Sequence, residues 1–328
     1  WYRLSAEQGD VIAQNNLLMN TFSEKPLITI GFPVYNIDEK FLYTALDSLL
    51  NQSYTNFELL ISDDCSTDST SRICCEYAKK DSRIRYIRQK KNLGHLHNFN
   101  FVLEQAKSKY FMWAEVDDKW KPEFIEKNIS FLESNPKFVG SISEVSWYGK
   151  NIVRGKGSKI KNLLKFRKTH DIFSNYFHVF PTSGTYDEKA SMYLRFNRGT
   201  SIFAVYKTEK LQKSIIKEPF GGWDLAIILK VLRFGDINVL DENLMERYPG
   251  GSSSQTLLIS QRREHGGLLG SLFLYMPLTF WCLKNLGTKI FFKNFDWFIV
   301  LNGYGLSIVL PEIPQLIKYI FSRKNPKE

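Results

Sequence analysis

The chain contains 328 residues, of which 43% are hydrophobic and 15% aromatic. These apolar side chains suffice for a sizeable core and exclude a wholly disordered protein. Lys and Arg together number 44 and Asp and Glu 34, so the formal charge is +10. The four cysteines lack the spacings of zinc sites and of secreted disulfide frameworks, which predicts a reduced, cytoplasmic setting.

The N-terminal segment 1–25 is predicted to be helical. Its AEQGD turn at Ala6–Asp10 is followed by small apolar residues and resembles half of a Sel1-like repeat. An ordinary N-terminal helix explains the pattern equally well, because one half-repeat cannot bury its apolar face alone. The chain begins with Trp1 and shows no signal-peptide pattern, so we expect a fragment without a leader.

From residue 26 onward, apolar β-branched runs alternate with amphipathic helical segments. This alternation indicates βαβ units and an α/β, Rossmann-like fold with a mostly parallel sheet flanked by helices. The expected strands are Leu27–Phe32, Phe57–Ser62, Ile84–Ile87, Tyr110–Trp113, Phe138–Ile142, Ser201–Tyr206 and Asp236–Leu240. The expected helices are Lys40–Asn51, Ser69–Lys79, Leu96–Ala106, Pro122–Glu133 and Trp223–Arg233.

Two acidic clusters follow expected strands. Asp63 and Asp64 end the second strand, and Glu115, Asp117 and Asp118 follow the fourth. Ligands of parallel sheets bind beyond the carboxyl ends of the strands, and an all-oxygen cluster suits Mg²⁺ or Mn²⁺. The structural alternatives are a turn with a helix N-cap after Asp64 and a solvated loop before the next helix.

Three segments together resemble the nucleotide-binding half of family 2 glycosyltransferases, which have a GT-A fold. The segments are PLITIGFPVYN, NQSYTNFELLISDDCSTDST and NLGHLHNFNFVLEQAKSKYFMWAEVDDKWKPE. The resemblance covers residues 26–142, weakens over 195–255 and is absent from 1–22 and from the C-terminal tail. It implies an inverting enzyme that moves a hexosyl or N-acetylhexosaminyl group from a UDP- or dTDP-sugar to a glycan or lipid-linked hydroxyl in cell-surface polysaccharide synthesis.

The resemblance also divides the chain and assigns roles to residues. It implies a GT-A domain over 26–255, with a nucleotide-binding half (26–145) and an acceptor half (146–255), followed by a helical, aromatic-rich extension (256–328). Asp117 would bind the divalent cation, and Arg88 or Lys91 could approach the diphosphate. The residues expected to contact the nucleotide are Pro33, Tyr35, Asp63, Asp64, Asn92, Gly94 and Glu115. Glu115 departs from the Asp that commonly opens the family's D-x-D motif.

An inverting transfer needs a general base for the acceptor hydroxyl. Asp224, in the sequence GGWDL at an expected helix start, is the predicted base, and Glu218 is the reserve. Two glycines stand where many family members carry Glu-Asp. Asp224 could instead be a first-turn acid that the helix dipole stabilises. Trp223 beside it is the aromatic residue most expected to contact the acceptor.

The segment Arg247–Ser252 resembles the family's Y-R-x-H-G-G-S pattern, with Pro249 at the His position. Because proline cannot bind a metal or a phosphate, Arg247 or the glycine-rich backbone is expected to hold the diphosphate. His265 is the reserve ligand.

Basic stretches and the aromatic C-terminal tail indicate which kinds of partner the protein could bind. Residues 150–168 carry eight basic and no acidic side chains, but no nucleic-acid-binding motif is present, so no nucleic acid is expected. The tail mixes aromatic residues with Lys284, Lys289 and Lys293, which suits the surface of an anionic membrane at the inner face. A packed helical subdomain is an equal alternative for this tail.

Two other functions stay open from the sequence. A non-catalytic nucleotide-sugar-binding or scaffold module fits the missing acids at 221–222 and the missing His at 249. A sugar-nucleotide pyrophosphorylase would need a Gly-rich, basic N-terminal loop over the phosphates, and residues 33–36 offer none.

Overall fold

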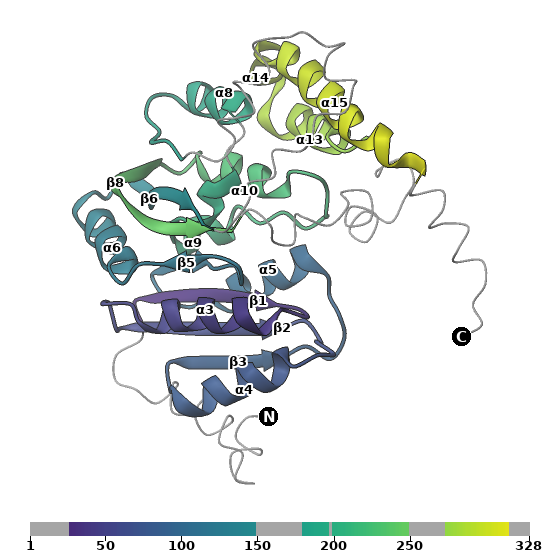
Figure 1. The fold of residues 1–328 in the computed structure, drawn as a ribbon. Helices are drawn as coiled ribbons and strands as arrows, with labels where there is room; N and C mark the ends of the chain where they lie inside the picture. Colours follow the sequence, from purple (N-terminus) through teal and green to yellow (C-terminus); the bar gives the residue numbers. More distant parts are fainter. Residues whose placement is uncertain (1–25, 149–178, 197–198, 249–272, 315–328) are drawn as a thin grey trace.

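The computed structural model describes residues 26–148, 179–196, 199–248 and 273–314 (Figure 1). The Sel1-like segment, the basic stretch 150–168, Pro249 and His265 lie outside these ranges, so their predicted roles stay untested. Within the described ranges, no helix has both the length and the apolar character needed to cross a bilayer.

One eight-stranded sheet forms the centre of the molecule, in the order β3-β2-β1-β4-β7-β6-β8-β5. Four pairings are parallel (β1 with β2, β1 with β4, β2 with β3, β6 with β8) and three are antiparallel (β4 with β7, β6 with β7, β5 with β8). The strands are β1 (Ile28–Val34), β2 (Phe57–Asp63), β3 (Ile84–Arg88), β4 (Tyr110–Trp113), β5 (Lys119–Trp120), β6 (Phe138–Trp147), β7 (Val205–Lys207) and β8 (Asp236–Arg247).

Helices cover both faces of the N-terminal part of the sheet. Every residue of β2 is buried, as expected for a parallel strand between two helical layers. Ser62 donates a hydrogen bond to Asn98 on one face, and the next residue, Asp63, accepts one from Ser71 on the other. These helices are α3 (Glu39–Leu50), α4 (Thr70–Lys80), α5 (His95–Gln105) and α6 (Phe124–Ser134).

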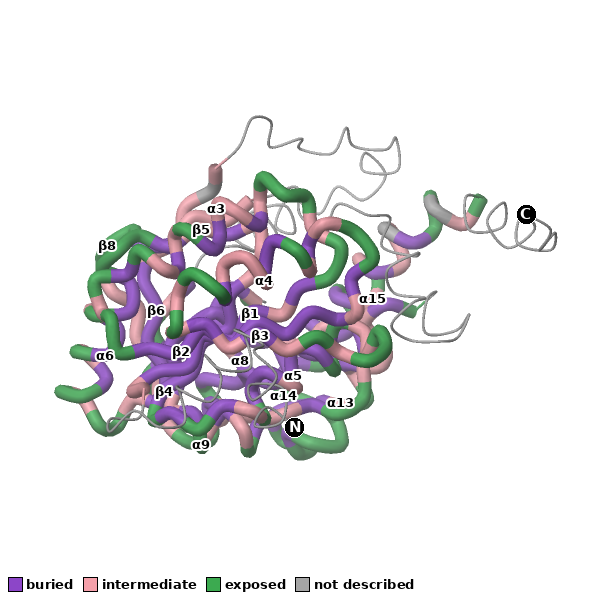
Figure 2. Tube along the Cα trace, turned by 90° about the horizontal axis from the view of Figure 1, so that it is seen from below, coloured by how far each residue is buried: buried purple, intermediate pink, exposed green. Residues whose placement is uncertain are grey.

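The C-terminal half adds a second group of helices, which Figure 1 shows at the end of the molecule away from β3 and α4. Burial is continuous from the central strands into the helices that pack on them (Figure 2). These elements are α8 (Tyr186–Phe196), the 3₁₀ helix η2 (Gly199–Phe203), α9 (Thr208–Gln212), α10 (Trp223–Val231), α13 (Met276–Leu286), α14 (Thr288–Lys293), α15 (Phe295–Val309) and η4 (Leu310–Glu312). The expected helical extension is therefore present where it is described.

Two predicted elements differ from the structure. The strand expected at Ser201–Tyr206 is wrong, because η2 occupies its first part and only Val205–Lys207 is extended. The carbonyl of Ser201 accepts hydrogen bonds from Ala204 N–H and from the Tyr206 hydroxyl, which stabilises the tighter turn. Strand β8 runs seven residues beyond its predicted end at Leu240, to Arg247. Asn243, Met245, Glu246 and Arg247 pair with β6 again after the exposed charged residues Asp241 and Glu242, which break the apolar pattern.

Candidate active site

The carboxyl ends of β1, β2 and β4 meet at one edge of the sheet. In the registers of these parallel strands, Val34 lies opposite Asp63 and Gly31 opposite Trp113. The residues that follow, including Tyr35, Asp64 and Glu115, therefore project from the same edge, which is the ligand-binding edge of open α/β sheets.

Asp63 holds the turn after β2 and is fully buried. It accepts hydrogen bonds from the Ser66 N–H at 2.8 Å, from the Tyr86 hydroxyl at 2.7 Å and from the Ser71 hydroxyl. Burial alone would raise the pKa of Asp63, but the hydrogen bonds from Ser66, Ser71 and Tyr86 lower it below its ordinary value. These hydrogen bonds make Asp63 an anchor of the turn after β2.

Asp64 holds the loop in front of α5. Its two carboxylate oxygens accept hydrogen bonds from the N–H groups of Leu93 at 2.6 Å and Gly94 at 3.0 Å. Asn92 donates to the Asp64 carbonyl at 3.3 Å, and Gly94 adopts φ 86°, a conformation that favours glycine. Burial raises the pKa of Asp64, although the two N–H groups oppose this shift. The predicted nucleotide residues 64, 92 and 94 therefore form one hydrogen-bonded unit.

Tyr35 and Pro33 border the same unit. Tyr35 directly follows β1 and is 43% exposed, so a ligand can reach it. Pro33, opposite Ser62 in β2, is partly buried. Asn36 beyond them donates a side-chain hydrogen bond to Thr67 and receives one from the Thr67 N–H, which joins the loops after β1 and β2.

The three acids after β4 converge as predicted. Glu115, Asp117 and Asp118 each offer a carboxylate oxygen within 4.8 Å of the others. The Tyr148 hydroxyl donates to the Asp117 carbonyl at 2.7 Å and fixes this turn. Burial, followed by the neighbouring Glu115, raises the pKa of Asp117 to about 6. Clustered carboxylates of this kind are the donor set that Mg²⁺ and Mn²⁺ prefer, so the residues present fit such a cation.

Arg247 lies against this cluster, at the end of β8. Its Nη2 is 2.8 Å from Glu115 Oε2, and its Nε is 3.1 Å from Asp118 Oδ2. Its guanidinium carbon also lies 4.6 Å from the centre of the Phe203 ring. Burial raises the pKa values of Glu115 and Asp118, and the Arg247 charge counteracts this. Arg247 thus contacts carboxylates of the cluster, whereas the sequence predicted a contact with diphosphate.

Asp224 is the second residue of α10, which begins at Trp223 after the N-cap Gly222, whose φ is 88°. A Cβ atom on Gly199 would overlap the Asp224 carboxylate, so η2 approaches this side chain closely. Burial raises the pKa of Asp224, and both Arg247 and His95 lie near enough to lower it. Asp224 in turn raises the pKa of Glu115. The predicted base therefore shares one electrostatic environment with the acid cluster, while the reserve, Glu218, is exposed in the preceding loop.

His95 connects the start of α5 with α10, the helix that carries the predicted base, and sequence reasoning missed it. Its ring centre lies 4.4 Å from that of Phe99 and 5.6 Å from that of Trp223. Burial raises the pKa values of Asp64 and Asp224, and His95 lies near enough to both carboxyl groups to oppose this shift. The only sequence signal was its position directly after the Asn92–Gly94 turn.

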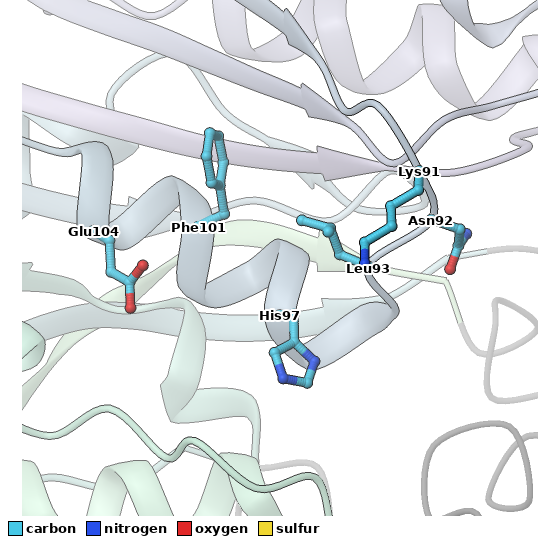
Figure 3. Close-up of a pocket in the computed structure, with 6 residues that line it drawn as sticks. All are labelled: Lys91, Asn92, Leu93, His97, Phe101 and Glu104. Carbon is cyan, nitrogen blue, oxygen red and sulfur yellow. The ribbon is translucent and has the colours of Figure 1, made fainter.

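A separate hollow of about 420 Å³ lies beside α5 (Figure 3). It is lined by Lys91, Asn92, Leu93, His97, Phe101 and Glu104. His97, Phe101 and Glu104 recur at helical spacing on one side of α5. The hollow shares Asn92 with the nucleotide loop but contains none of the acids of the cluster.

Solved structures with the same fold support the observed architecture. The mannosyltransferase PcManGT of Pyrobaculum calidifontis superposes with a TM-score of 0.54 at 13% identity, covering 96% of this chain and 85% of that one. TarS 1–349 of S. aureus superposes with a TM-score of 0.50 at 20% identity, covering 89% and 78%. The predicted GT-A fold is thus confirmed.

Sequence comparison gives the family. A teichuronic acid biosynthesis glycosyltransferase, TuaG of Bacillus subtilis, is 37% identical over 108 residues, which are 33% of this chain and 42% of that protein. GlyA, a glycosyltransferase of Streptococcus pneumoniae, is 28% identical over 217 residues, 66% of this chain and 27% of that protein. The alignments thus span less than half of these relatives. The family profile matches residues 29–194, just over half of the chain, which therefore belongs to glycosyl transferase family 2.

Proposed function

We propose that the protein is an inverting glycosyltransferase that moves a sugar from a nucleotide diphosphate to a hydroxyl of a glycan or lipid-linked acceptor in cell-surface polysaccharide synthesis. One observation carries the proposal: Arg247, which pairs with the acid cluster, also lies against Phe203 of η2. The same 3₁₀ helix approaches the Asp224 carboxylate at Gly199. The names of TuaG and GlyA support glycosyl transfer.

The loops after β1 and β2 would bind the nucleoside. Tyr35 offers an exposed ring to the base, and Pro33 supports it from β1. Asp64 would face the base while it holds Asn92 and Gly94, with Asp63 as its anchor. Glu115 would contact the ribose. TarS 1–349 was solved with UDP and with UDP-GlcNAc, which supports a UDP- or dTDP-sugar as donor and a hexosyl or N-acetylhexosaminyl transfer.

Asp117 would hold the divalent cation, with Glu115 and Asp118 beside it. A bound Mn²⁺ or Mg²⁺ would neutralise the charge that develops on the leaving diphosphate. PcManGT was solved with GDP-Man and Mn²⁺, which supports a metal in this fold. The positive charge of Arg247 compensates the negative charges of Glu115 and Asp118. In addition, Arg247 would contact the diphosphate.

Asp224 would act as the general base. As the acceptor oxygen attacks the anomeric carbon, its proton passes to the Asp224 carboxylate. The new C–O bond forms while the bond from the anomeric carbon to the diphosphate oxygen breaks, and the nucleoside diphosphate leaves with that electron pair. A pKa raised by burial suits this role, because a stronger base accepts the proton more readily. Trp223 beside it would contact the acceptor.

The test compares turnover with binding. Wild-type protein should hydrolyse or transfer from a UDP- or dTDP-sugar in the presence of Mn²⁺, and Asp224→Asn should lower turnover by at least about a hundredfold while calorimetry still detects nucleotide binding. Glu218→Gln, in the exposed loop before α10, is the matched control and should keep its activity. Equal activity of Asp224→Asn and wild type would assign the base elsewhere. Nucleotide binding without any turnover in wild type would favour the non-catalytic binding module.

We propose the same division of the chain as its sequence indicates: a nucleotide half over 26–145, an acceptor half over 146–255 and an extension over 256–328. Helix α10, which carries Asp224, packs against α13 of the extension. This contact brings the extension next to the helix that carries the proposed base.

A further inference from the structure

An apolar surface is exposed on the C-terminal helices α13, α14 and α15. Phe280 is 64% exposed, Phe292 66% and Ile299 60%, although large apolar side chains normally prefer the interior. We call this surface the extension face, which consists of Phe273, Phe280, Leu283, Phe292, Phe295, Ile299, Val300 and Leu310.

The packing of α13 against α15 shows why these residues lie on one side. Asn302 donates a hydrogen bond to Thr279 at 2.8 Å, and a Cβ atom on Gly305 would touch Tyr275 and Leu274. Residue numbers rise along one helix as they fall along the other, so the two helices are antiparallel.

On both helices, the exposed apolar residues are displaced from the helix–helix contact in the same direction of rotation, viewed along each helix from its N-terminus. Each residue turns a helix by about 100°, so Leu283 lies about 40° round from Thr279, and Ile299 lies about 60° round from Asn302. In an antiparallel pair, equal senses of rotation from the contact line lead to the same side. Phe292 extends this side through α14, where its ring centre lies 6.4 Å from that of Phe295.

The charge around the extension face is positive. Among the described residues 273–314, the basic residues are Lys284, Lys289 and Lys293 and the acidic ones Asp296 and Glu312. Lys289 is paired with Asp187 at 2.7 Å. Lys284 and Lys293 are exposed beside the apolar residues, on α13 and α14. Asp296, an acid on α15, is paired with Arg195 at 2.8 Å. Aromatic residues with lysines beside them are typical of helices that lie in the interface of an anionic bilayer.

The extension face is rigidly linked to the candidate base. A Cβ atom on Gly222, directly before α10, would touch Leu278 of α13. The ring centres of Phe220 and Trp281 lie 6.2 Å apart, and Asp224 contributes to the raised pKa of Tyr275 at the start of α13. If α13 rests on a surface, Asp224 on α10 is therefore held at a fixed distance from that surface.

We infer that the extension face docks the protein onto an anionic phospholipid surface. The inference rests on the proposed function only in that a lipid-linked acceptor would be presented at that surface. The exposed Lys284 and Lys293 beside the face favour an anionic lipid surface over a second copy of this chain, because two faces of equal positive charge repel each other.

The experiment measures cosedimentation of the full chain with vesicles. Wild type should bind vesicles of phosphatidylglycerol and phosphatidylcholine, and binding should fall on added salt and on vesicles of phosphatidylcholine alone. Phe280→Ser with Phe292→Ser should lower the partition coefficient by about tenfold or more. Lys284→Glu with Lys293→Glu should lower it by at least as much.

The matched control is Lys79→Glu with Lys80→Glu on α4, which lies at the opposite end of the molecule (Figure 1). It removes the same charge and should leave vesicle binding unchanged. Calorimetry of UDP binding should give the same result for all variants, which separates this test from that of the proposed function.

Several results would overturn the inference. Wild-type protein that stays in the supernatant shows that the extension face does not bind anionic lipid. Dimers in analytical ultracentrifugation that Phe280→Ser with Phe292→Ser abolishes, without vesicle binding, assign the face to a second copy. Equal loss of binding in the Lys79 and Lys80 control shows attraction by net charge alone.

Discussion

Arg247 compensates the charge of the carboxylates that follow β4. Its guanidinium contacts Glu115 at 2.8 Å and Asp118 at 3.1 Å, in a site where Asp118 is only 1% exposed. Removing one partner of a buried ion pair leaves an uncompensated charge, which costs more than the pair contributes. Arg247 therefore stabilises the folded site before any ligand binds.

We expect Arg247→Met to lower the free energy of unfolding by about 3 kcal/mol at pH 7. Burial already raises the pKa values of Glu115 and Asp118, and loss of the cation raises them further. Because protonation then removes the buried charges, the destabilisation should shrink as the pH falls from 7 to 5. Urea unfolding at both pH values measures this.

The control is Arg72→Met, which breaks exposed pairs with Glu76 and Glu39. It should leave the free energy of unfolding nearly unchanged at either pH, because solvent screens exposed ion pairs. A loss for Arg247→Met that is equal at pH 7 and pH 5 would contradict the role of Arg247 as counter-charge.

Gly199 allows η2 to approach the carboxylate of Asp224. Because an added Cβ atom would overlap that carboxylate, Gly199→Ala should displace it and lower kcat by about tenfold or more. Nucleotide affinity should change little, since η2 does not belong to the loops after β1 and β2. Steady-state kinetics with a UDP-sugar, beside calorimetry, distinguish the two effects, and unchanged kcat would show that Asp224 is not the base in this position.

The two acidic clusters could be predicted because they directly follow apolar strands, where the carboxyl ends of a parallel sheet meet. The partner of Glu115 and Asp118 could not, because Arg247 lies more than 120 residues away and reaches them through the long pairing of β6 with β8. His95 was missed for a similar reason: its contact with Trp223 depends on how α5 and α10 pack.

At the scale of elements, the N-terminus of α5 depends on Gly94. Its φ of 86° is strained for any other residue, and no atom lies within 4 Å of an added Cβ. Gly94→Ala should therefore cost about 1–2 kcal/mol through the backbone alone, and it should weaken nucleotide binding by loosening the contact with Asp64. Chemical denaturation and calorimetry measure the two effects.

Gly303 in α15 is the matched control. It also has open space around an added Cβ, but it lies inside a helix without a positive φ. Gly303→Ala should raise the free energy of unfolding by about 0.5–1 kcal/mol. If both variants destabilise equally, backbone strain is not the reason at Gly94.

Strands β1, β2 and β4 could be predicted because both of their faces are buried, which leaves largely apolar runs. Strand β8 was predicted too short, since its pattern mixes buried residues such as Met245 with exposed ones such as Asp241 and Glu242. The expected strand at Ser201–Tyr206 failed because its β-branched and aromatic residues form a tight turn that a hydroxyl of Tyr206 stabilises.

At the scale of the whole molecule, the candidate site is formed by the edge of the sheet on one side and by α10 with α13 on the other. The sheet edge with Tyr35 and Asp64 would receive the nucleotide, and α10 with α13 would connect Asp224 to the extension face. The catalytic and membrane-binding proposals use different residues. Each therefore stands or fails by its own experiment.

Calorimetry of UDP binding with and without Mn²⁺ tests the central claim most directly, namely that Asp64 and Asp117 act on one nucleotide diphosphate. Mn²⁺ should strengthen binding to wild type by about tenfold or more. Asp117→Asn should lose this gain, Asp64→Asn should weaken binding with and without Mn²⁺, and the exposed control Glu123→Gln should match wild type. Wild-type protein that binds no nucleoside diphosphate more tightly with Mn²⁺, or Asp117→Asn that keeps the full gain, would contradict the account.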